Sequence, residues 1–461
     1  MSEQGLKQAV NKMTDAGLPP ATIEVFRHYY RALAEGATGR VAEDEITPVT
    51  DLPQLADQQV EESVARDALA KTVMIRLNGG LGTSMGITKA KSLLPVADGR
   101  SFLDLIVAQV KAAREQHGVR LPLLLMNSFR TREDTLKALA AYPDLAVDGL
   151  PLDFVQSSEP KLRADDLTPV EWPDNPDLEW CPPGHGDIYP SLLGAGLLDE
   201  LIDRGFRYAL VANSDNLGAT PDPLLAGWFA STGAPFAIEV CARTKADRKG
   251  GHLALRRSDD RLILREVAQT AKEDMDAFTD ENRHRWFSTN SLWWDLVQVR
   301  DVLVERDGVL GLPLIRNAKT VDPGDPSSPE VIQIETAMGA AIEVFEGATA
   351  IGVPRSRFLP VKTTNDLLLL RSDAYEVDEA GAVALVAEQA CLVDLDPAFY
   401  KRLADFDERF PDGAPSLRDA QRLVVRGSWT FGPDVTVRGA VDLADPGDPA
   451  QIEPGAELAG S

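Results

Sequence analysis

The segment from Leu77 to Lys91 (LNGGLGTSMGITKAK) combines residue types that bind nucleotide phosphates. Its glycines let the backbone approach a ligand closely and turn N–H groups toward phosphate oxygens. No acidic residue occurs between positions 71 and 91, and the cations of this stretch are Lys71, Arg76, Lys89 and Lys91. The spacing matches neither the P-loop nor the GxGxxG motif. A tight strand-to-helix turn would explain the glycines alone equally well. The basic residues around them favour a phosphate-binding loop.

Two further basic stretches occur later in the chain. Residues 353–364 (VPRSRFLPVKTT) and 242–252 (ARTKADRKGGH) contain Arg355, Arg357 and Lys362, and Arg243, Lys245, Arg248 and Lys249, respectively. A single stretch of this kind is more often a solvated basic edge than a site. Together they suggest a polyphosphate held from more than one side.

His185 and Asp215 are the other candidates for chemistry. His185 stands between two glycines and after two prolines, in a rigid loop that favours substrate contact over general-base duty. Asp215 follows an apolar strand, where one carboxylate could bind Mg²⁺ on a triphosphate. A structural histidine and a turn-capping aspartate are the alternatives. No Ser-His-Asp order or paired-acid signature occurs, and five histidines disfavour a His-rich metal site.

The elements around these residues predict an α/β fold. Apolar runs of strand length occupy 73–77, 122–126, 208–213 and 236–242, and 101–116 has helical periodicity. Ser101 is a natural N-cap, with Asp104 three residues later. This order predicts βαβ units and a mostly parallel sheet, with the glycine-rich loop at the carboxyl edge where ligands bind.

The flanking regions differ from this pattern. Residues 1–70 predict helices, including one with Ile23, Phe26 and Leu33 on one face, followed by an acidic connector (41–63) that we expect to cross the surface. After residue 375, short β runs punctuated by glycine and proline predict coils of a small left-handed β-helix. We therefore divide the chain into 1–70, 71–375 and 376–461.

Composition excludes several classes of protein. The 461 residues are 44% hydrophobic and 26% charged, as in a globular protein, and the net charge of -25 disfavours nucleic acid and anionic membrane as partners. The N-terminal residues resemble no signal peptide, and no apolar run approaches the ~18 residues of a membrane span. Sparse cysteines at 181, 241 and 391 fit a reducing compartment, so we expect the cytoplasm.

Eight segments, in collinear order over residues 70–375, resemble the eukaryotic-type UTP–glucose-1-phosphate uridylyltransferases (UDP-glucose pyrophosphorylases). They are LNGGLGTSMG, LLLMNSFRTREDT, PPGHGDIY, SDNLGAT, RKGGHL, FSTNSLW, QIETAMGAAI and PRSRFLPVKTTNDLLLL. The resemblance implies a Rossmann-like, glycosyltransferase A-like nucleotidyltransferase domain with a mixed sheet, a helical N-terminal part and a C-terminal left-handed β-helix.

The resemblance also implies roles for individual residues. UTP would contact Leu77, Asn78, Gly79, Gly80, Lys91, Met126, Gln156, Gly184, Asp215 and Lys362, with Met126, Gln156 and Gly184 at uracil, Lys91 and Lys362 at the triphosphate, and Asp215 on Mg²⁺. The sugar phosphate would contact His185, Asn213, Asn290 and Glu335. Three segments depart from the family pattern: ITKAK (87–91), SDNLG, and FSTNSLW with serines at 288 and 291.

The implied reaction joins UTP and glucose 1-phosphate into UDP-glucose and pyrophosphate. One alternative is a pyrophosphorylase for N-acetylhexosamine or other sugars, although Gly80-Leu81-Gly82-Thr83 differs from the Gly-Gly-Gln-Gly-Thr loop of that group. The other is a nucleotide-binding regulator without catalysis, which the presence of Lys91, Lys362 and Asp215 disfavours. The sequence leaves the oligomeric state open.

Overall fold

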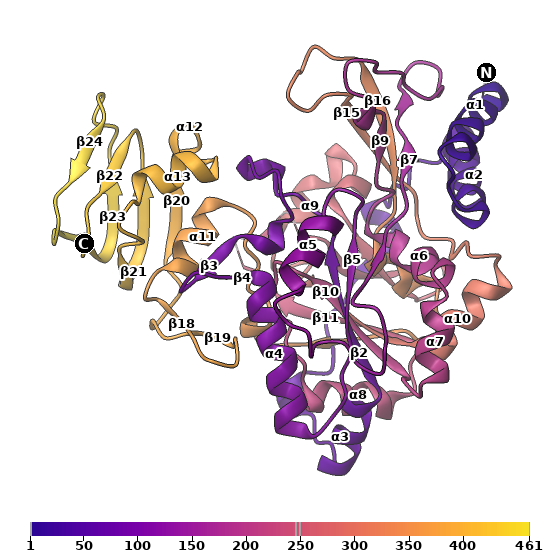
Figure 1. Cartoon of the computed structure of the whole chain (residues 1–461), viewed down its shortest axis with the longest axis horizontal. Helices are drawn as coiled ribbons and strands as arrows, with labels where there is room; N and C mark the ends of the chain where they lie inside the picture. Colours follow the sequence, from indigo (N-terminus) through magenta and orange to yellow (C-terminus); the bar gives the residue numbers. More distant parts are fainter. Residues whose placement is uncertain (1, 245–246, 249, 461) are drawn as a thin grey trace.

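The computed structural model describes residues 2–244, 247–248 and 250–460, and in Figure 1 a large sheet lies between layers of helices. Within these residues ten strands form the sheet. In spatial order they are β1 (Ile46–Pro48), β12 (His252–Arg256), β14 (Trp286–Asp295), β10 (Tyr208–Asn213), β2 (Thr72–Asn78), β5 (Leu123–Asn127) and β6 (Asp153–Val155), with β13 (Leu262–Arg265) on β12, β11 (Phe236–Ala242) on β14 and β17 (Thr349–Gly352) on β11.

The sheet is mixed. Strands β10, β2, β5 and β6 run parallel, but β14 runs antiparallel to both β10 and β11. The sheet expected from the βαβ pattern alone, mostly parallel, is therefore wrong, and the mixed sheet implied by the family resemblance is confirmed. The pattern covered only the half of the sheet built by helical crossovers. The other half is built by antiparallel pairs such as β12–β13, which need no crossover helix.

The unit that presents the glycine-rich loop is β2, the loop, α4 (Phe102–His117) and β5. The side chain of Ser101 accepts a hydrogen bond from the backbone N–H of Asp104 (3.2 Å), and the carboxylate of Asp104 accepts one from the backbone N–H of Ser101 (2.8 Å), so the predicted capping box is confirmed. The helix ends at Gly118, which has φ +64°. The loop follows the carboxyl end of β2, as expected.

Alternate residues of the central strands face two different helical layers. In β2, Met74 belongs to the hydrophobic cluster under α4, whereas Val73 and Ile75 belong to the cluster on the opposite face. This period of two is the normal geometry of a strand that is buried on both faces. The first layer contains α3 (Glu62–Ala70), α4, α5 (Arg132–Leu139) and α8 (Pro223–Thr232), and the second contains α6 (Ile188–Gly194), α7 (Leu197–Asp203) and α10 (Leu296–Glu305).

The N-terminal helices α1 (Ser2–Asp15) and α2 (Pro20–Ala34) pack against a separate three-stranded sheet. That sheet consists of β8 (Leu162–Arg163), β15 (Ile315–Thr320) and β16 (Glu330–Glu335). The predicted buried face of α2 is confirmed, since Ile23, Phe26 and Leu33 are all buried. The helix ends two residues before Gly36.

The acidic connector is more deeply embedded than we expected. Ile46 is fully buried where β1 pairs with β12, and the carboxylate of Glu43 receives the buried guanidinium of Arg265 (2.5 Å) and the guanidinium of Arg283 (2.6 Å). Most residues of this segment do lie at the surface, as predicted, but Ile46, Val49 and Leu55 are buried. The pairing of Glu43 with the buried Arg265 is a contact that a composition-based interpretation does not detect.

The C-terminal region contains parallel strands and lies at one end of the molecule (Figure 1). Four strands form one sheet: β20 (Leu392–Leu395), β21 (Ser416–Val425), β23 (Thr436–Leu443) and β25 (Glu457–Ala459). A second parallel pair is β22 (Trp429–Phe431) with β24 (Ala450–Ile452). Leu417 and Val437 belong to the same hydrophobic cluster as α4, so one continuous core joins this region to the central sheet.

The remaining elements are short. They are β3 (Pro95–Ala97) with β4 (Arg100–Ser101), β7 (Glu159–Pro160) with β9 (Trp180–Cys181), β18 (Tyr375–Val377) with β19 (Val383–Leu385), and the helices α9 (Met275–Thr279), α11 (Thr364–Arg371), α12 (Pro397–Tyr400) and α13 (Leu403–Arg409). Among the helices that the structure describes, none is long and apolar enough to cross a membrane.

A buried ion pair involves a strand of the sheet. Glu239 of β11 has no exposed surface, and its carboxylate accepts hydrogen bonds from Nε of Arg357 (2.6 Å), Nη2 of Arg357 (2.9 Å) and the indole of Trp293 (2.9 Å). These contacts fasten the segment 353–364 to the sheet. Removing one member of such a pair leaves an uncompensated buried charge.

We predict that Glu239→Gln lowers the free energy of unfolding by about 3–5 kcal/mol, because the buried Arg357 then loses its hydrogen-bonded counter-ion and keeps only the more distant Asp222 (3.7 Å). The midpoint of urea-induced unfolding measures this loss. Glu24→Gln is the matched control, because Glu24 is exposed and pairs with Arg27 across one helical turn, so its loss should change the midpoint little. Equal midpoints for wild type and Glu239→Gln would contradict the prediction.

Candidate active site

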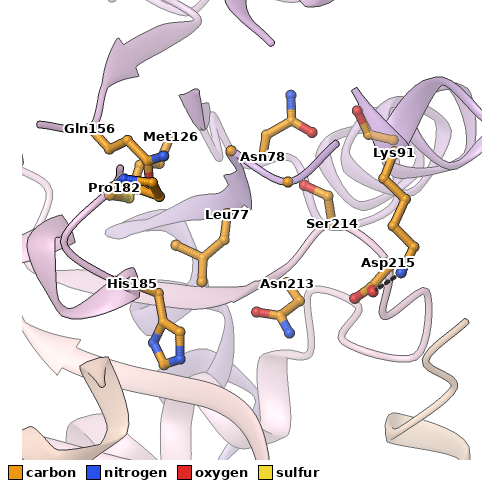
Figure 2. Close-up of a pocket in the computed structure, with 14 residues that line it drawn as sticks. Leu77, Asn78, Lys91, Met126, Gln156, Pro182, His185, Asn213, Ser214 and Asp215 are labelled. Atoms are coloured by element: carbon orange, nitrogen blue, oxygen red, sulfur yellow. Dashed lines mark hydrogen bonds and ion pairs between the residues drawn. The ribbon is translucent and has the colours of Figure 1, made fainter. Parts of the chain in front are cut away.

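A pocket with a volume of about 300 Å³ opens at the carboxyl ends of β2, β5 and β10 (Figure 2). Because these three strands are parallel, the residues that follow them meet at one edge of the sheet. The lining comprises Leu77, Asn78, Gly79, Gly80, Lys91, Ser92, Met126, Gln156, Pro182, Gly184, His185, Asn213, Ser214 and Asp215. The structure thus brings together most of the site residues predicted from sequence, from segments far apart in the chain.

One end of the pocket is formed by Gln156 and Gly79. Gln156 follows β6, and its backbone N–H donates to the carbonyl of Asn127 (2.8 Å). A Cβ at position 79 would lie 2.8 Å from the side-chain nitrogen of Gln156, so a larger residue there would displace that amide. Asn78 is committed to the fold, because its amide nitrogen donates to Asn127 (2.7 Å) and Thr135 (2.9 Å).

The loop that carries His185 is held by backbone pairing with the segment after β16. Gly184 has φ +79°, and a Cβ there would lie 2.5 Å from the carbonyl oxygen of Thr336, so glycine is required. The N–H of Thr336 donates to the carbonyl of Pro183 (3.0 Å), and the N–H of Gly186 donates to that of Thr336 (2.9 Å). This pairing fixes the imidazole at the pocket wall.

His185 is a neutral hydrogen-bond donor in this setting. The N–H of Met338 donates to Nδ1 of His185 (2.9 Å), so the imidazole hydrogen is on Nε2. Burial lowers the pKa of His185 from 6.5 to about 4, which leaves the ring uncharged near neutral pH. With Nδ1 occupied and Nε2 protonated, the ring can donate to a ligand but is not set up as a general base. This arrangement agrees with the expected role in contact rather than proton abstraction.

The opposite end of the pocket holds a cation and a carboxylate. Nζ of Lys91 lies 2.5 Å from Oδ2 of Asp215, and both side chains are mostly buried (Figure 2). The backbone N–H of Lys91 donates to the carbonyl of Gly80 (3.0 Å), which closes the glycine-rich loop. Asp215 is the carboxylate of the lining, and the described residues contain no cluster of three or more His, Cys, Asp or Glu side chains that could hold a metal.

Arg76 holds the turn that presents Asp215. Its guanidinium is fully buried and donates to the carbonyls of Asn213 (3.0 Å), Asn216 (3.0 Å) and Ala219 (2.7 Å). Burial lowers its pKa to about 9, so it stays charged at neutral pH. Arg76 therefore positions the Asp215 turn from beneath.

The same turn is also tied to the segment 355–362. The amide nitrogen of Asn216 donates to the carbonyl of Arg357 (3.1 Å), and its oxygen accepts from the N–H of Leu359 (2.9 Å). The N–H of Val361 donates to the carbonyl of Asp215 (3.3 Å). These bonds link the Asp215 turn, at the edge of the pocket, to the segment that the Glu239–Arg357 pair holds on the sheet.

The expectation that the three basic stretches hold a polyphosphate from more than one side is wrong for most of their arginines and stays a prediction for Lys91 and Lys362. Arg355 pairs with Asp247 (2.6 Å), Arg243 donates to the carbonyl of Phe278 (2.5 Å), and Arg76 and Arg357 are buried as described above. Lys71 lies beyond the amino end of β2, at the opposite edge of the sheet from the pocket. Arg248 pairs with Glu281 (3.5 Å), while Lys245 and Lys249 lie outside the described residues. These buried or paired arginines stabilise the fold, and this role can be recognised only from their contacts in the structure.

Three predicted residues lie outside the lining. The amide nitrogen of Asn290 donates to Oδ1 of Asn213 (3.0 Å) from a bulge in β14, where Asn290 has φ +58°. Glu335 lies beside Gly184, and its carboxylate accepts from Asn317 (2.7 Å). Nζ of Lys362 lies 5.8 Å from the centre of the Phe358 ring, although the residue before it is bonded to the Asp215 turn. Their roles with ligand stay predictions.

Three lining residues escaped the sequence analysis: Ser92, Pro182 and Ser214. Ser92 and Ser214 directly neighbour Lys91 and Asp215, so proximity to a singled-out residue is the signal that could have found them. Pro182 is one of the two prolines that were used only as evidence for a rigid loop.

The chain is similar to proteins of one family along most of its length. The family described as UTP–glucose-1-phosphate uridylyltransferase matches residues 23–438. The enzyme of that name from Solanum tuberosum is 40% identical over 404 residues, 87% of this chain and 81% of the potato protein. A probable UTP–glucose-1-phosphate uridylyltransferase from Schizosaccharomyces pombe is 39% identical over 383 residues, 82% of this chain and 74% of the yeast protein.

Solved structures give the same result. The UDP-glucose pyrophosphorylase from Leishmania major, known in open and closed structures, is 41% identical and superposes with a TM-score of 0.93, covering 99% of this chain and 98% of its own. A point mutant of that enzyme in complex with UDP-glucose has a TM-score of 0.92 at the same identity and coverage.

We predict that His185 makes the protein less stable in acid. Its folded pKa (about 4) lies below its ordinary value (6.5), so the stability due to the neutral ring is present above pH 6.5 and is lost as the pH falls toward 4. Between pH 7 and pH 5, wild type should lose about 2 kcal/mol more stability than His185→Asn, whose amide oxygen can still accept from Met338. Urea unfolding at both pH values measures the difference, and parallel losses in the two proteins would contradict it.

Proposed function

The chain belongs to the UTP–glucose-1-phosphate uridylyltransferase family and is therefore a nucleotidyltransferase, and we propose that it forms UDP-glucose and pyrophosphate reversibly from UTP and glucose 1-phosphate. The observation that carries this proposal is the pocket at the carboxyl edge of the sheet. One of its ends offers backbone and amide groups suited to a base, and the other offers the Lys91–Asp215 pair suited to phosphates.

UTP would lie along this pocket. Its uracil would contact Gln156, Met126 and the backbone of Gly184, and its ribose and α-phosphate would contact the segment 77–80. Lys91 would bind the triphosphate, and Lys362 would turn toward it from the segment bonded to the Asp215 turn. Glucose 1-phosphate would contact His185 and Asn213, with Asn290 and Glu335 beside them.

The chemistry is an in-line displacement. A phosphate oxygen of glucose 1-phosphate forms a bond to the α-phosphorus of UTP, while the bond from that phosphorus to the pyrophosphate oxygen breaks and the pyrophosphate takes the electron pair. The nucleophile is already an anion at neutral pH, so a general base is unnecessary. This agrees with His185 being a neutral donor. Positioning two anions and neutralising their charge is the main requirement.

Mg²⁺ fits the residues present. Magnesium commonly takes one or two protein carboxylates and completes its shell with phosphate oxygens and water, and Asp215 supplies one carboxylate at the phosphate end. When bound, the ion would neutralise phosphate charge. Asp215 would then exchange its contact with Lys91 for the ion, which would leave the ammonium group available to the triphosphate.

Finer features of the fold and setting belong to the same proposal. The central region (71–375) would be a Rossmann-like domain of glycosyltransferase A type, preceded by the helical region 1–70. The parallel strands within 376–461 would be turns of a short left-handed β-helix. The three free, buried cysteines are compatible with activity in the cytoplasm.

One assay tests the substrate choice. Release of pyrophosphate from UTP should be fastest with glucose 1-phosphate in a panel that includes galactose, N-acetylglucosamine and N-acetylgalactosamine 1-phosphates. Chelation by EDTA should abolish the reaction, and added Mg²⁺ should restore it. A preference for an N-acetylhexosamine would support the alternative pyrophosphorylase, and no release with any sugar would support a nucleotide-binding regulator.

We predict that Lys91→Ala and Lys362→Ala each lower turnover about 100-fold or more, because each removes a cation from the charge that develops on pyrophosphate. Steady-state kinetics measure the loss, and circular dichroism checks that each variant is folded. Lys137→Ala, an exposed lysine of α5, is the control and should keep full activity. A folded Lys362→Ala protein with near-normal turnover would refute the role of Lys362.

A further inference from the structure

The glycine-rich loop (77–91), which we call the phosphate loop from here on, extends beyond the pocket and reaches the C-terminal region. Its inner part, 77–80 and Lys91, lines the pocket, whereas Gly86 lies against a residue more than 300 positions later in the chain. A Cβ at Gly86 would be 3.5 Å from Cγ of Arg402, so the stem of this arginine packs on the loop backbone. In Figure 1 the loop, drawn in purple, extends toward α13.

Arg402 occupies a rigid junction between α12 and α13. Its carbonyl accepts the N–H of Phe406 (2.9 Å), and the hydroxyl of Tyr400 donates to the carbonyl of Trp429 (2.8 Å). Ile87 of the loop and Leu403 of α13 are both partly buried against the same large hydrophobic cluster. The backbone of Arg402 is thus held by α13, while its side chain remains exposed.

The guanidinium of Arg402 lacks a counter-ion, in contrast to its neighbours. Within the part of the chain that the structure describes, every other arginine after residue 376 has a hydrogen-bonding or ion-pair partner: Arg409, Arg418, Arg422, Arg426 and Arg438. Arg402 has none in the same residues, although 72 acidic residues outnumber 47 basic ones in the sequence. An unpaired arginine at a phosphate loop is available to an anion.

The glycine-rich loop connects the phosphate end of the pocket to Arg402. The pocket runs from Gln156 to the Lys91–Asp215 pair (Figure 2). Beyond Lys91 comes Gly82, whose Cβ position is 3.4 Å from Cγ of Lys91, and the loop then leads to Gly86 and Arg402. A group that extends past Lys91 along the loop approaches the part of the loop against which Arg402 packs. In UTP that group is the β- and γ-phosphates, which leave as pyrophosphate.

We propose that Arg402 of the C-terminal region binds the pyrophosphate part of UTP and the pyrophosphate product across the phosphate loop. This inference rests on the proposed function, because the proposed function sets the direction in which UTP lies in the pocket. A planar guanidinium can bind two phosphate oxygens at once, which a point charge such as Lys89 cannot do in the same way. The C-terminal region thus contributes a binding residue to a site otherwise built by the central sheet.

A comparison of the binding of UTP and of UDP-glucose distinguishes this role from a structural one. UTP and pyrophosphate carry the phosphates that Arg402 would bind, whereas UDP-glucose has no pyrophosphate leaving group. Arg402→Ala should therefore raise KM for pyrophosphate in the reverse reaction, and KM for UTP in the forward reaction, about five- to tenfold. The dissociation constant for UDP-glucose, measured by titration calorimetry, should stay within about twofold of wild type.

Two further variants complete the experiment. Arg402→Lys keeps the charge and should recover part of the loss, and raising the ionic strength should shrink the difference between wild type and Arg402→Ala. Arg418→Ala removes an exposed arginine of the same region that pairs with Glu376, and it should leave all constants unchanged.

The outcomes discriminate between the proposals. Unchanged KM values for pyrophosphate and UTP in Arg402→Ala would overturn the role of Arg402. An equal weakening for UDP-glucose would overturn it too, since it would show that Arg402 only supports the loop. Failure of wild type to release pyrophosphate from UTP and glucose 1-phosphate would instead contradict the proposed function itself.

Discussion

The active-site geometry depends on one carboxylate buried in the sheet. Glu239 cannot reach solvent, so its charge must be met by Arg357, and this requirement fastens the segment 353–364 onto β11. That segment accepts and donates the hydrogen bonds of Asn216, and thereby holds the turn that carries Asp215. Arg76 holds the same turn from below. The phosphate end of the pocket is therefore positioned by charges that no ligand touches.

This arrangement separates two uses of positive charge. Buried arginines stabilise the fold through backbone carbonyls and buried carboxylates, where their charge is fully committed. The cations left for a substrate are those without such partners or, like Lys91, those paired with a carboxylate that itself lines the pocket. An acidic chain with net charge -25 can bind a polyanion in this way because a few cations act at short range, where screening by solvent is weakest.

Sequence reasoning recovered the local features and missed those that depend on distant partners. Strand periodicity, the capping box of Ser101 and the position of the glycine-rich loop depend on neighbouring residues, and all three were predicted. Motif resemblance gathered Gln156, His185 and Asp215 from separate segments, which periodicity alone could not do. The direction of β14, the anchoring of the connector through Glu43 and the commitment of Arg76 to carbonyls depend on residues more than 80 positions apart. Nothing in the local pattern distinguishes a buried arginine from one that binds phosphate.

The continuous hydrophobic core between α4 and the C-terminal strands has a consequence for how the chain is made. Leu417 and Val437 belong to the same cluster as residues of α4, which are synthesised some 300 positions earlier. While the ribosome is still translating, the part of this cluster that packs against the C-terminal strands is incomplete, and its apolar surface must wait for the last part of the polypeptide. Completion of the fold is therefore post-translational. A chain that stops before β21 would expose apolar surface to chaperones and proteases.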